Sequence, residues 1–299
     1  MILAPIVLFV YSRLEHTRQV VEALQNNILA KDSELIIYSD FAKTKELEDK
    51  VKEVREYIKY IDGFKNVTII YRDKNLGLAN SIIDGVTTVV NRYGKVIVLE
   101  DDIVTNRYFL KFMNEALEFY KDKKKVWHIA GWNYPISSEG LDDTFLWRLM
   151  NCWGWATWSD RWDYFEKDSD KLIKEFTKEQ IKYMNLDGCL KTWSQVISNK
   201  KGIIDTWAVY WYACIIKNNG LCLNPVKTLV INIGFDGSGE NCGRNDAYES
   251  ALSDKETLFF STDLYENTIA LQRIIQFYNT QKKITIKRII NKIKRVFGK

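Results

Sequence analysis

The sequence predicts a mixed α/β fold with a mainly parallel central sheet, and three observations lead to that prediction. Within the first hundred residues, four short apolar runs alternate with three amphipathic segments. Such alternation is typical of a parallel sheet with right-handed crossovers and helices on both faces. The run at residues 96–99 is apolar without a break, as in a strand buried on both faces. A content of 46% hydrophobic and 27% charged residues in a 299-residue chain is ordinary for a globular protein with an ample core.

Hydrophobic spacing places the elements of the first half. Residues 1–11 are apolar, but they lack a basic leader and are too short to span a bilayer, so they predict a first strand. Ser12 is a candidate cap for the helix that follows. Strands are expected at residues 2–11, 34–38, 66–71 and 95–99, and helices at 14–24, 43–61 and 78–90.

The second half is less regular. A long amphipathic segment at 168–200 is expected to be largely helical, and residues 234–243 form a Gly-rich loop that could fold over a ligand. Further helices are expected at 106–120, 207–216 and 263–278, and strands at 126–130, 145–150, 221–223 and 227–233.

Three acids, Glu100, Asp101 and Asp102, follow the fourth predicted strand directly. Ligands of open α/β sheets bind at the carboxyl ends of the strands, and adjacent carboxylates are costly unless a cation lies among them. One interpretation is therefore a divalent cation site. The other is an acidic loop that caps the next helix, and these residues alone do not decide between the two.

The other predicted strand ends also carry polar side chains. Basic residues at two of these ends and acids at a third suit a phosphate and metal site, although Arg13 and Arg72 taken singly are better explained as surface cations. Neither the G-x-G-x-x-G dinucleotide fingerprint nor the G-x-x-x-x-G-K-[ST] phosphate loop is present. The candidates are Tyr11 and Arg13 after the first strand, Asp40 after the second, and Arg72, Asn75 and Gly77 after the third.

Aromatic residues dominate the middle of the chain. All ten tryptophans lie between Trp127 and Trp211, with a dense cluster at residues 153–162. Indole rings suit sugar rings as stacking platforms, but an apolar plug beneath the sheet explains most of them equally well. Asp205 precedes the apolar segment 207–216, a position where an N-cap is favoured over a catalytic role.

Cysteines and charge suggest where the protein works. The five cysteines are odd in number and lack C-x-x-C pairing, which disfavours a disulfide framework or a structural zinc site and favours a reducing compartment. Residues 281–299 contain eight Lys or Arg and no acid, with Ile286, Ile289, Ile290 and Ile293 at helical spacing. This pattern favours a helix that binds an anionic membrane surface over a terminus that only adds solubility. Binding to nucleic acid is the weakest of these three interpretations.

Six short motifs, in the same order, resemble bacterial glycosyltransferases of the GT-A fold, in the branch related to family 2 and to N-acetylglucosaminyltransferase I. The similarity covers residues 3–240. Its motifs are Val10-Tyr-Ser-Arg13 with His16, Asn75-Leu-Gly-Leu-Ala-Asn80, Glu100-Asp-Asp102, Ala130-Gly-Trp-Asn133, Trp153-Gly-Trp-Ala156 and Asn232-Ile-Gly-Phe-Asp236.

The resemblance implies a Rossmann-like sheet that binds a nucleotide-sugar at its strand ends. Asp102 would hold Mn²⁺ or Mg²⁺, and Asp205 would act as the catalytic base, which reverses the N-cap preference. The implied donor-binding residues are Tyr11, Arg13, Asp40, Arg72, Asn75, Gly77 and Asp101, and the implied acceptor-binding residues are Trp132, Trp155 and Trp207. Many relatives carry a His after the Gly-Phe segment, where this chain has Glu240-Asn241-Cys242.

By this resemblance residues 1–125 form the donor half, 126–260 the acceptor and catalytic half, and 261–299 a C-terminal helix with a membrane-associating tail. The expected activity is metal-dependent, inverting transfer of a hexosyl or N-acetylhexosaminyl group. The expected donor is a UDP-sugar, and the expected acceptor is a lipid-linked glycan of a bacterial capsule or O-antigen at the cytoplasmic face of the cell membrane. The alternatives are a sugar-nucleotide nucleotidyltransferase, disfavoured because Val10-Tyr-Ser-Arg-Leu14 has no Gly, and a catalytically silent glycan-binding module.

Overall fold

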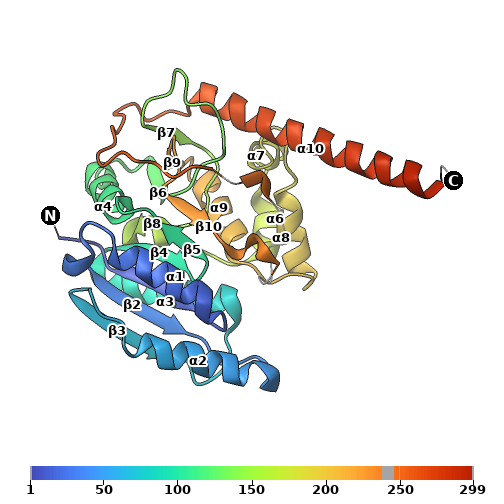
Figure 1. Cartoon of the computed structure of the whole chain (residues 1–299). Coiled ribbons are helices and arrows are strands. Elements are labelled where there is room, and N and C mark those ends of the chain that lie inside the picture. The colour runs from blue at the N-terminus through green and yellow to red at the C-terminus, as the bar shows by residue number, and fades with distance from the viewer. Residues whose placement is uncertain (1, 238–245, 249, 298–299) are drawn as a thin grey trace.

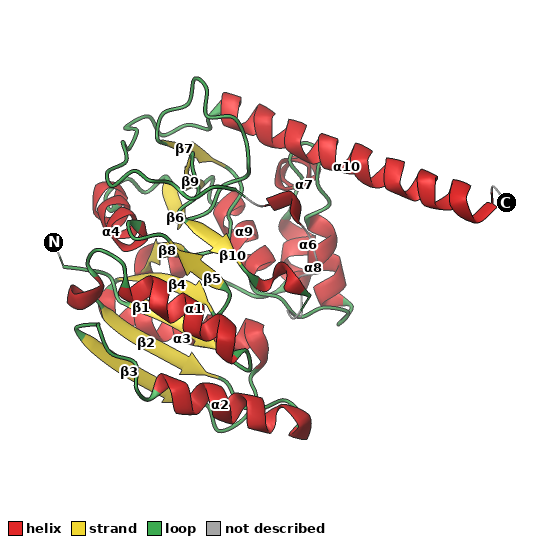
Figure 2. Cartoon of the chain, viewed as in Figure 1, coloured by secondary structure: helices red, strands yellow, loops and turns green. Residues whose placement is uncertain are grey.

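An eight-stranded mixed sheet forms the centre of the computed structural model, which describes residues 2–237, 246–248 and 250–297, with side chains up to residue 283 (Figure 2). The strand order is β3-β2-β1-β4-β8-β6-β9-β7. Strands β1 to β4 are mutually parallel, which confirms the predicted α/β fold class. Their bounds are Ile6–Val10 (β1), Glu34–Ser39 (β2), Asn66–Tyr71 (β3) and Lys95–Glu100 (β4).

The strand order reverses between β1 and β4. The chain first adds β2 and β3 on one side of β1, then crosses back and places β4 on the other side. The reversal of direction leaves a crevice at the carboxyl ends of β1 and β4, which is where ligands bind in open α/β sheets. The helices of this half are α1 (Leu14–Gln25), α2 (Glu48–Ile58) and α3 (Gly77–Tyr93), close to their predicted bounds.

The strands after residue 125, the predicted boundary between the two halves, belong mostly to the same sheet. Strand β8 (Trp155–Trp158) pairs antiparallel with both β4 and β6, and the prediction missed it because these residues were assigned only to a tryptophan cluster. The other strands are β6 (Val126–Ala130), β7 (Thr144–Trp147) and β9 (Leu221–Pro225). A separate two-stranded sheet pairs β5 (Ile103–Thr105) with β10 (Val230–Asn232).

The longest predicted helical stretch of the second half is divided into three helices. The segment expected to be one helical stretch at 168–200 forms α6 (Ser169–Glu175), α7 (Lys178–Met184) and α8 (Trp193–Lys200). A capping box between Thr177 and Gln180 starts α7, and positive φ angles at Leu186 and Asp187 separate it from α8. The remaining helices before the C-terminal one are α4 (Phe109–Tyr120), α5 (Ser159–Trp162) and α9 (Ala208–Lys217).

The C-terminal helix α10 (Thr268–Phe297) extends away from the rest of the molecule (Figure 1). Its first turns bury Ala270 and Ile274, and the buried Arg148 pairs with Glu266 just ahead of the helix. One continuous helix therefore replaces the predicted helix at 263–278 and its separate tail. In the part of the chain that the structure describes, no helix is long and apolar enough to cross a membrane. The side chains of the predicted membrane-binding stripe, Ile286 to Ile293, lie outside the described residues.

Candidate active site

Arg13, Asp101 and Asp102 meet at the crevice between β1 and β4. Asp101 and Asp102 are 5% and 8% exposed, and the Arg13 guanidinium lies between them. Arg13 Nη2 donates to Asp101 Oδ1 and, over 2.9 Å, to Asp102 Oδ2. Arg13 Nη1 is buried and has no hydrogen-bond partner among the described residues. The two carboxylates thus share the Arg13 guanidinium. Its buried Nη1 remains as a donor suited to an anion.

Burial makes this group of charges costly. The pKa of Asp101 is raised because its carboxyl is buried, although Arg13 opposes the shift. Burial, and then repulsion from Asp102 and Asp101, raises the pKa of Glu100 to about 8. Burial alone would lower the pKa of Arg13, but its contacts with Asp101 and Asp102 outweigh burial and raise it. The raised pKa values mean that Arg13 alone does not offset the burial of these acids, and a second cation would favour their charged forms.

The acids do not cap a helix, so that alternative for the triplet is wrong. They lead into β5, and α4 begins after Tyr108 without a side-chain cap. The facing strand β10 is followed by a 3₁₀ turn at Gly234–Asp236, which lies against Asp102. Ile233 N donates to Asp102 O over 2.9 Å, and a Cβ at Gly234 would lie 2.4 Å from Asp102 Oδ2. The glycine therefore keeps open the space that a ligand of this carboxylate would need.

This arrangement fits the predicted Mn²⁺ or Mg²⁺. Carboxylate oxygens are the donors that both ions prefer, and Mg²⁺ sites use one or two carboxylates plus substrate phosphates. Among the described residues no group of three or more His, Cys, Asp or Glu side chains could hold a metal without such a substrate. Asp102 as the protein ligand stays a prediction.

Asp40 is buried and ties the end of β2 to the start of α3. Its carboxylate accepts from Leu76 N and Gly77 N, each over 3.0 Å, from Phe41 N over 2.9 Å and from Asn75 Nδ2 over 3.2 Å. These bonds occupy both oxygens and satisfy donors at the N-terminus of a helix. Asp40, Asn75 and Gly77 therefore come together as predicted, with Asp40 shaping the turn.

Tyr11 and Arg72 lie at neighbouring strand ends. Tyr11 Oη accepts from Lys43 N over 2.8 Å, which fixes the ring against the loop after β2. Arg72 pairs with Asp84 of α3, and its Cζ lies 4.8 Å from the centre of the Tyr38 ring. The guanidinium of Arg72 is thus directed to α3, and the described contacts do not join it to the acids.

An aromatic cavity of about 330 Å³ is lined by part of the turn that contacts Asp102. The turn that touches Asp102 forms one of its walls, since Asn232, Phe235 and Asp236 line it. The ring of Trp132 meets that of Trp153 edge to face at 4.4 Å, and Phe235 packs on Trp153 at 5.3 Å. Trp153 is only partly buried, so this ring offers a surface to a ligand. Of the three tryptophans predicted to bind an acceptor, Trp132 lies at this cavity.

Trp155 and Trp207 lie in the hydrophobic core. They are 1% and 4% exposed, and their rings stack at 5.1 Å. Trp155 also stacks on His128 at 5.3 Å, so two neighbouring rings pack on its indole. Neither ring presents a face to a sugar, and the structure places both in the apolar core that the sequence left open as the alternative.

Asp205, the predicted base, is 62% exposed at its side chain and pairs with Lys167. It does not cap α9, because that helix begins after Trp207 with no side-chain cap. It is not one of the residues that line the aromatic cavity, and no described contact joins it to Asp101 or Asp102. Its catalytic role stays a prediction.

Sequence reasoning did not assign His16 and Asp236 to the site. His16 Nε2 of α1 lies 3.2 Å from Asp236 Oδ2, at the end of the turn that contacts Asp102. Both residues stand in motifs of the resemblance, Val10-Tyr-Ser-Arg13 with His16 and Asn232-Ile-Gly-Phe-Asp236, but neither was given a role. The cavity-lining Trp153, Phe235 and Tyr248 were also missed.

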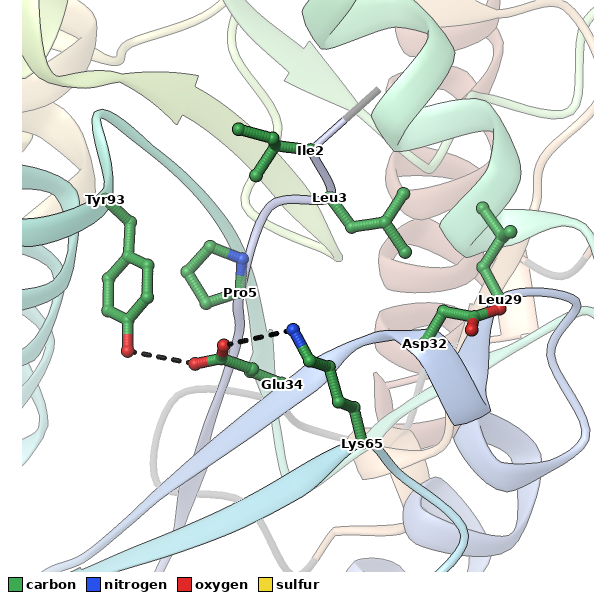
Figure 3. Close-up of a pocket in the computed structure, with 8 residues that line it drawn as sticks. All are labelled: Ile2, Leu3, Pro5, Leu29, Asp32, Glu34, Lys65 and Tyr93. Atoms are coloured by element: carbon green, nitrogen blue, oxygen red, sulfur yellow. Dashed lines mark hydrogen bonds and ion pairs between the residues drawn. The ribbon is translucent and has the colours of Figure 1, made fainter.

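A larger cavity, of about 580 Å³, lies at the opposite edge of the sheet. Figure 3 shows Glu34 between Tyr93 and Lys65, with the Tyr93 hydroxyl donating to Glu34 over 2.9 Å. Pro5 and Glu34 lie at the amino ends of β1 and β2, so this cavity is remote from the strand ends where the acids lie. The site at Arg13 and Asp102 is therefore the better candidate, since it lies at the carboxyl ends.

No protein-family model and no curated protein matches the sequence. Among solved structures, the chain is similar to the mannosyltransferase PcManGT from Pyrobaculum calidifontis in complex with GDP-Man and Mn²⁺, at 10% identity and a TM-score of 0.37 over 72% of this chain and 70% of that one. It is also similar to S. aureus TarS, at 13% identity and a TM-score of 0.30 over 44% of this chain and 22% of TarS. For TarS residues 1–349 the values are 12% and 0.35, over 53% and 48%. Similarity at this level concerns the fold alone, and the chain spans about a fifth of the length of TarS.

Proposed function

We propose that this protein is a metal-dependent glycosyltransferase that moves a sugar from a nucleotide-sugar to a hydroxyl group of a glycan, with inversion at the anomeric carbon. The observation that supports this proposal most is that one turn separates two compartments, the site at Asp102 and the aromatic cavity. The turn Gly234–Asp236 touches the Asp102 carboxylate and also lines the aromatic cavity. One compartment suits a diphosphate with its cation and the other suits a sugar ring, so two substrates would meet at one turn.

The donor would lie across the carboxyl ends of β1 to β4. Arg13 Nη1, buried without a partner, is suited to donate to a phosphate oxygen, and Asp101 holds that guanidinium in place. Tyr11, Asp40, Asn75, Gly77 and Arg72 would shape the nucleotide side of the site. A bound Mn²⁺ or Mg²⁺ at Asp102 supplies Lewis-acid neutralisation of the departing diphosphate.

The acceptor would enter the aromatic cavity next to Trp132 and Trp153. The sequence resemblance favours a hexosyl or N-acetylhexosaminyl group from a UDP-sugar, and it offers Asp205 as one candidate for the base. A lipid-linked glycan of a capsule or O-antigen, built at the cytoplasmic face of the membrane, agrees with the basic sequence of residues 281–299. The C-terminal part of α10 would then act as a peripheral anchor.

Ligand-dependent stabilisation tests the proposal. The unfolding midpoint of the protein is measured with UDP, GDP and a panel of UDP- and GDP-sugars, with and without MnCl₂. At a ligand concentration of 100 Kd, binding to the native state adds about 2.7 kcal/mol to its stability. Asp102→Ala should abolish the manganese-dependent part of the shift, and the exposed Asp122→Ala should retain it. If no nucleotide or nucleotide-sugar stabilises the wild-type protein with manganese, the proposal is wrong.

A further inference from the structure

We infer that Asp236, oriented by His16, is the catalytic base that accepts the proton of the attacking acceptor hydroxyl. This inference rests on the proposed glycosyltransferase function and changes one assignment within it. The resemblance placed the base at Asp205, whereas the structure brings a different carboxylate to the place where the two compartments meet. His16 would be a positioning residue and Asp236 the residue that contacts the substrate.

The position of Asp236 is the first support. Asp236 ends the 3₁₀ turn whose first residue, Gly234, abuts the Asp102 carboxylate. Asp236 also lines the aromatic cavity beside Trp153 and Phe235. Its side chain is 49% exposed, so an incoming hydroxyl can reach it. A base must lie within hydrogen-bond reach of the proton that it removes, and this carboxylate is at the boundary between the donor and acceptor compartments.

The contact with His16 is the second support. His16 belongs to α1, which begins directly after Arg13, and its side chain is only 15% exposed. Its Nε2 lies 3.2 Å from Asp236 Oδ2, so a ring N–H can donate to one carboxylate oxygen. That bond would hold the carboxylate in place at the wall of the aromatic cavity. A base oriented by a neighbouring group is a recurrent arrangement in active sites.

Asp205 lacks the position of Asp236. Its side chain is 62% exposed and pairs with Lys167. The cavity wall includes Asp236 but not Asp205. Asp205 would need to lose its lysine partner and approach the cavity before it could accept a proton from a bound acceptor.

The chemical step balances with Asp236 as the base. The acceptor oxygen forms a bond to the anomeric carbon, and the bond from that carbon to the diphosphate oxygen breaks. The leaving nucleoside diphosphate takes the bonding electron pair, and the hydroxyl proton passes to Asp236 Oδ1. A single displacement of this kind inverts the anomeric configuration.

Matched variants separate the two candidate bases. Asp236→Asn and Asp205→Asn are compared in two measurements: titration calorimetry with UDP or GDP plus MnCl₂, and nucleoside diphosphate release from UDP-sugars and GDP-mannose in the presence of octyl glycosides. For Asp236→Asn we expect transfer to fall by about 10²- to 10⁴-fold, with nucleotide affinity unchanged to within about threefold. For Asp205→Asn we expect transfer within about threefold of wild type. Unfolding midpoints confirm that each variant is folded.

His16 is tested by rescue. His16→Ala should lower kcat by about tenfold with little change in the KM for the octyl glycoside, and His16→Gln, which keeps an N–H donor, should restore part of the loss. Wild-type transfer by Asp236→Asn, or loss of transfer in Asp205→Asn alone, would overturn the inference while leaving the proposed function intact. Failure of the wild-type protein to bind any nucleotide with manganese would instead overturn the proposed function and, with it, this inference.

Discussion

Gly234 faces the Asp102 carboxylate so closely that a Cβ at position 234 would lie 2.4 Å from Asp102 Oδ2. Real Cβ atoms do not approach an oxygen so closely, so any other residue here would displace the carboxylate. The close approach is possible because β10 pairs with β5 directly after the acids, which brings the turn at 234–236 back to Asp102. The loop and the acid therefore form one unit, although they are 132 positions apart in the sequence.

The first prediction concerns this contact. In Gly234→Ala the Asp102 carboxylate must rotate, and we expect manganese-dependent nucleotide binding to weaken by at least about tenfold, or about 1.4 kcal/mol. The unfolding midpoint should also fall, because the displaced oxygen accepts from Arg13 Nη2 in a buried ion pair. Calorimetric titration with UDP or GDP and MnCl₂ measures the effect. Gly140→Ala is the control: its φ of +68° strains the backbone of the variant, but nothing lies within 4 Å of its Cβ, so nucleotide binding should be retained. Equal binding by both variants would contradict the prediction.

Hydrophobic pattern predicted the first half of the fold well. The strand bounds predicted at 66–71 and 95–99 agree with β3 and β4 to within one residue. Residues with high β propensity between polar turns mark a strand at the sheet edge, as in β3, and in the buried centre, as in β4. The same signal failed at β8, where Trp155–Trp158 combines bulky rings that also suit a loop or a core plug. Pairing with β4 and β6, which the local pattern does not reveal, decides that this segment is a strand.

The candidate site was predictable only in part, for a similar reason. Strand ends marked Arg13, Asp101 and Asp102, since parallel strands bring their carboxyl ends to one edge. The partners of each side chain depend on contacts between distant segments. Asp40 is bound to the backbone of residues 76 and 77, and Asp236 is bound to His16, 220 positions earlier. Spacing along the chain contains no signal for either pair.

The second prediction is that Asp40 contributes mainly to stability. Its carboxylate accepts from Leu76 N and Gly77 N, and hydrogen bonds to a charged group contribute about 1.5–3 kcal/mol each. Asp40→Ala should therefore lower the free energy of unfolding by about 3 kcal/mol, and Asp40→Asn by less, as measured by urea denaturation. The exposed Asp73→Ala should stay within about 0.5 kcal/mol of wild type. A fully stable Asp40→Ala protein that had lost nucleotide binding would show that the residue serves the donor directly.

The third prediction separates two tryptophans of one motif. Trp155 is 1% exposed and stacked between His128 and Trp207, so Trp155→Ala should destabilise the fold by about 3–5 kcal/mol. Trp153 is partly exposed in the aromatic cavity, so Trp153→Ala should cost less stability and weaken the binding of octyl glycosides. Chemical denaturation and tryptophan fluorescence titration test the two effects. Unchanged glycoside binding by Trp153→Ala would argue against a sugar in this cavity.

The fourth prediction concerns pH. His128 is fully buried, Trp211 Nε1 donates to its Nδ1 over 3.3 Å, and its Nε2 lies 2.9 Å from Asn151 O. Burial lowers the pKa of His128 from 6.5 to about 4, so the native state favours the neutral ring. The unfolded state then binds more protons between these values, and stability is complete above pH 6.5 and falls as the pH drops towards 4. The full contribution is about 3 kcal/mol.

Urea denaturation at a series of pH values measures this dependence. Acidic groups also titrate in this range, so the quantity to compare is the slope of the free energy of unfolding against pH. His128→Asn removes only the histidine contribution and should flatten the slope between pH 4 and 6.5. An identical slope in the variant and the wild type would show that His128 is protonated equally in the folded and unfolded protein.

The fifth prediction concerns the basic C-terminus. Deleting residues 281–299 removes eight Lys or Arg, and each basic residue near an anionic surface contributes about 1 kcal/mol of binding free energy. The deletion should leave the fold intact, because the turns of α10 that bury Ala270 and Ile274 remain. We expect sedimentation with phosphatidylserine vesicles to be lost on deletion and to weaken with salt in the full chain. Lys287→Glu with Arg288→Glu should reduce vesicle binding without shortening the helix. If the shortened protein bound these vesicles as tightly as the full chain, the tail would not be the membrane anchor.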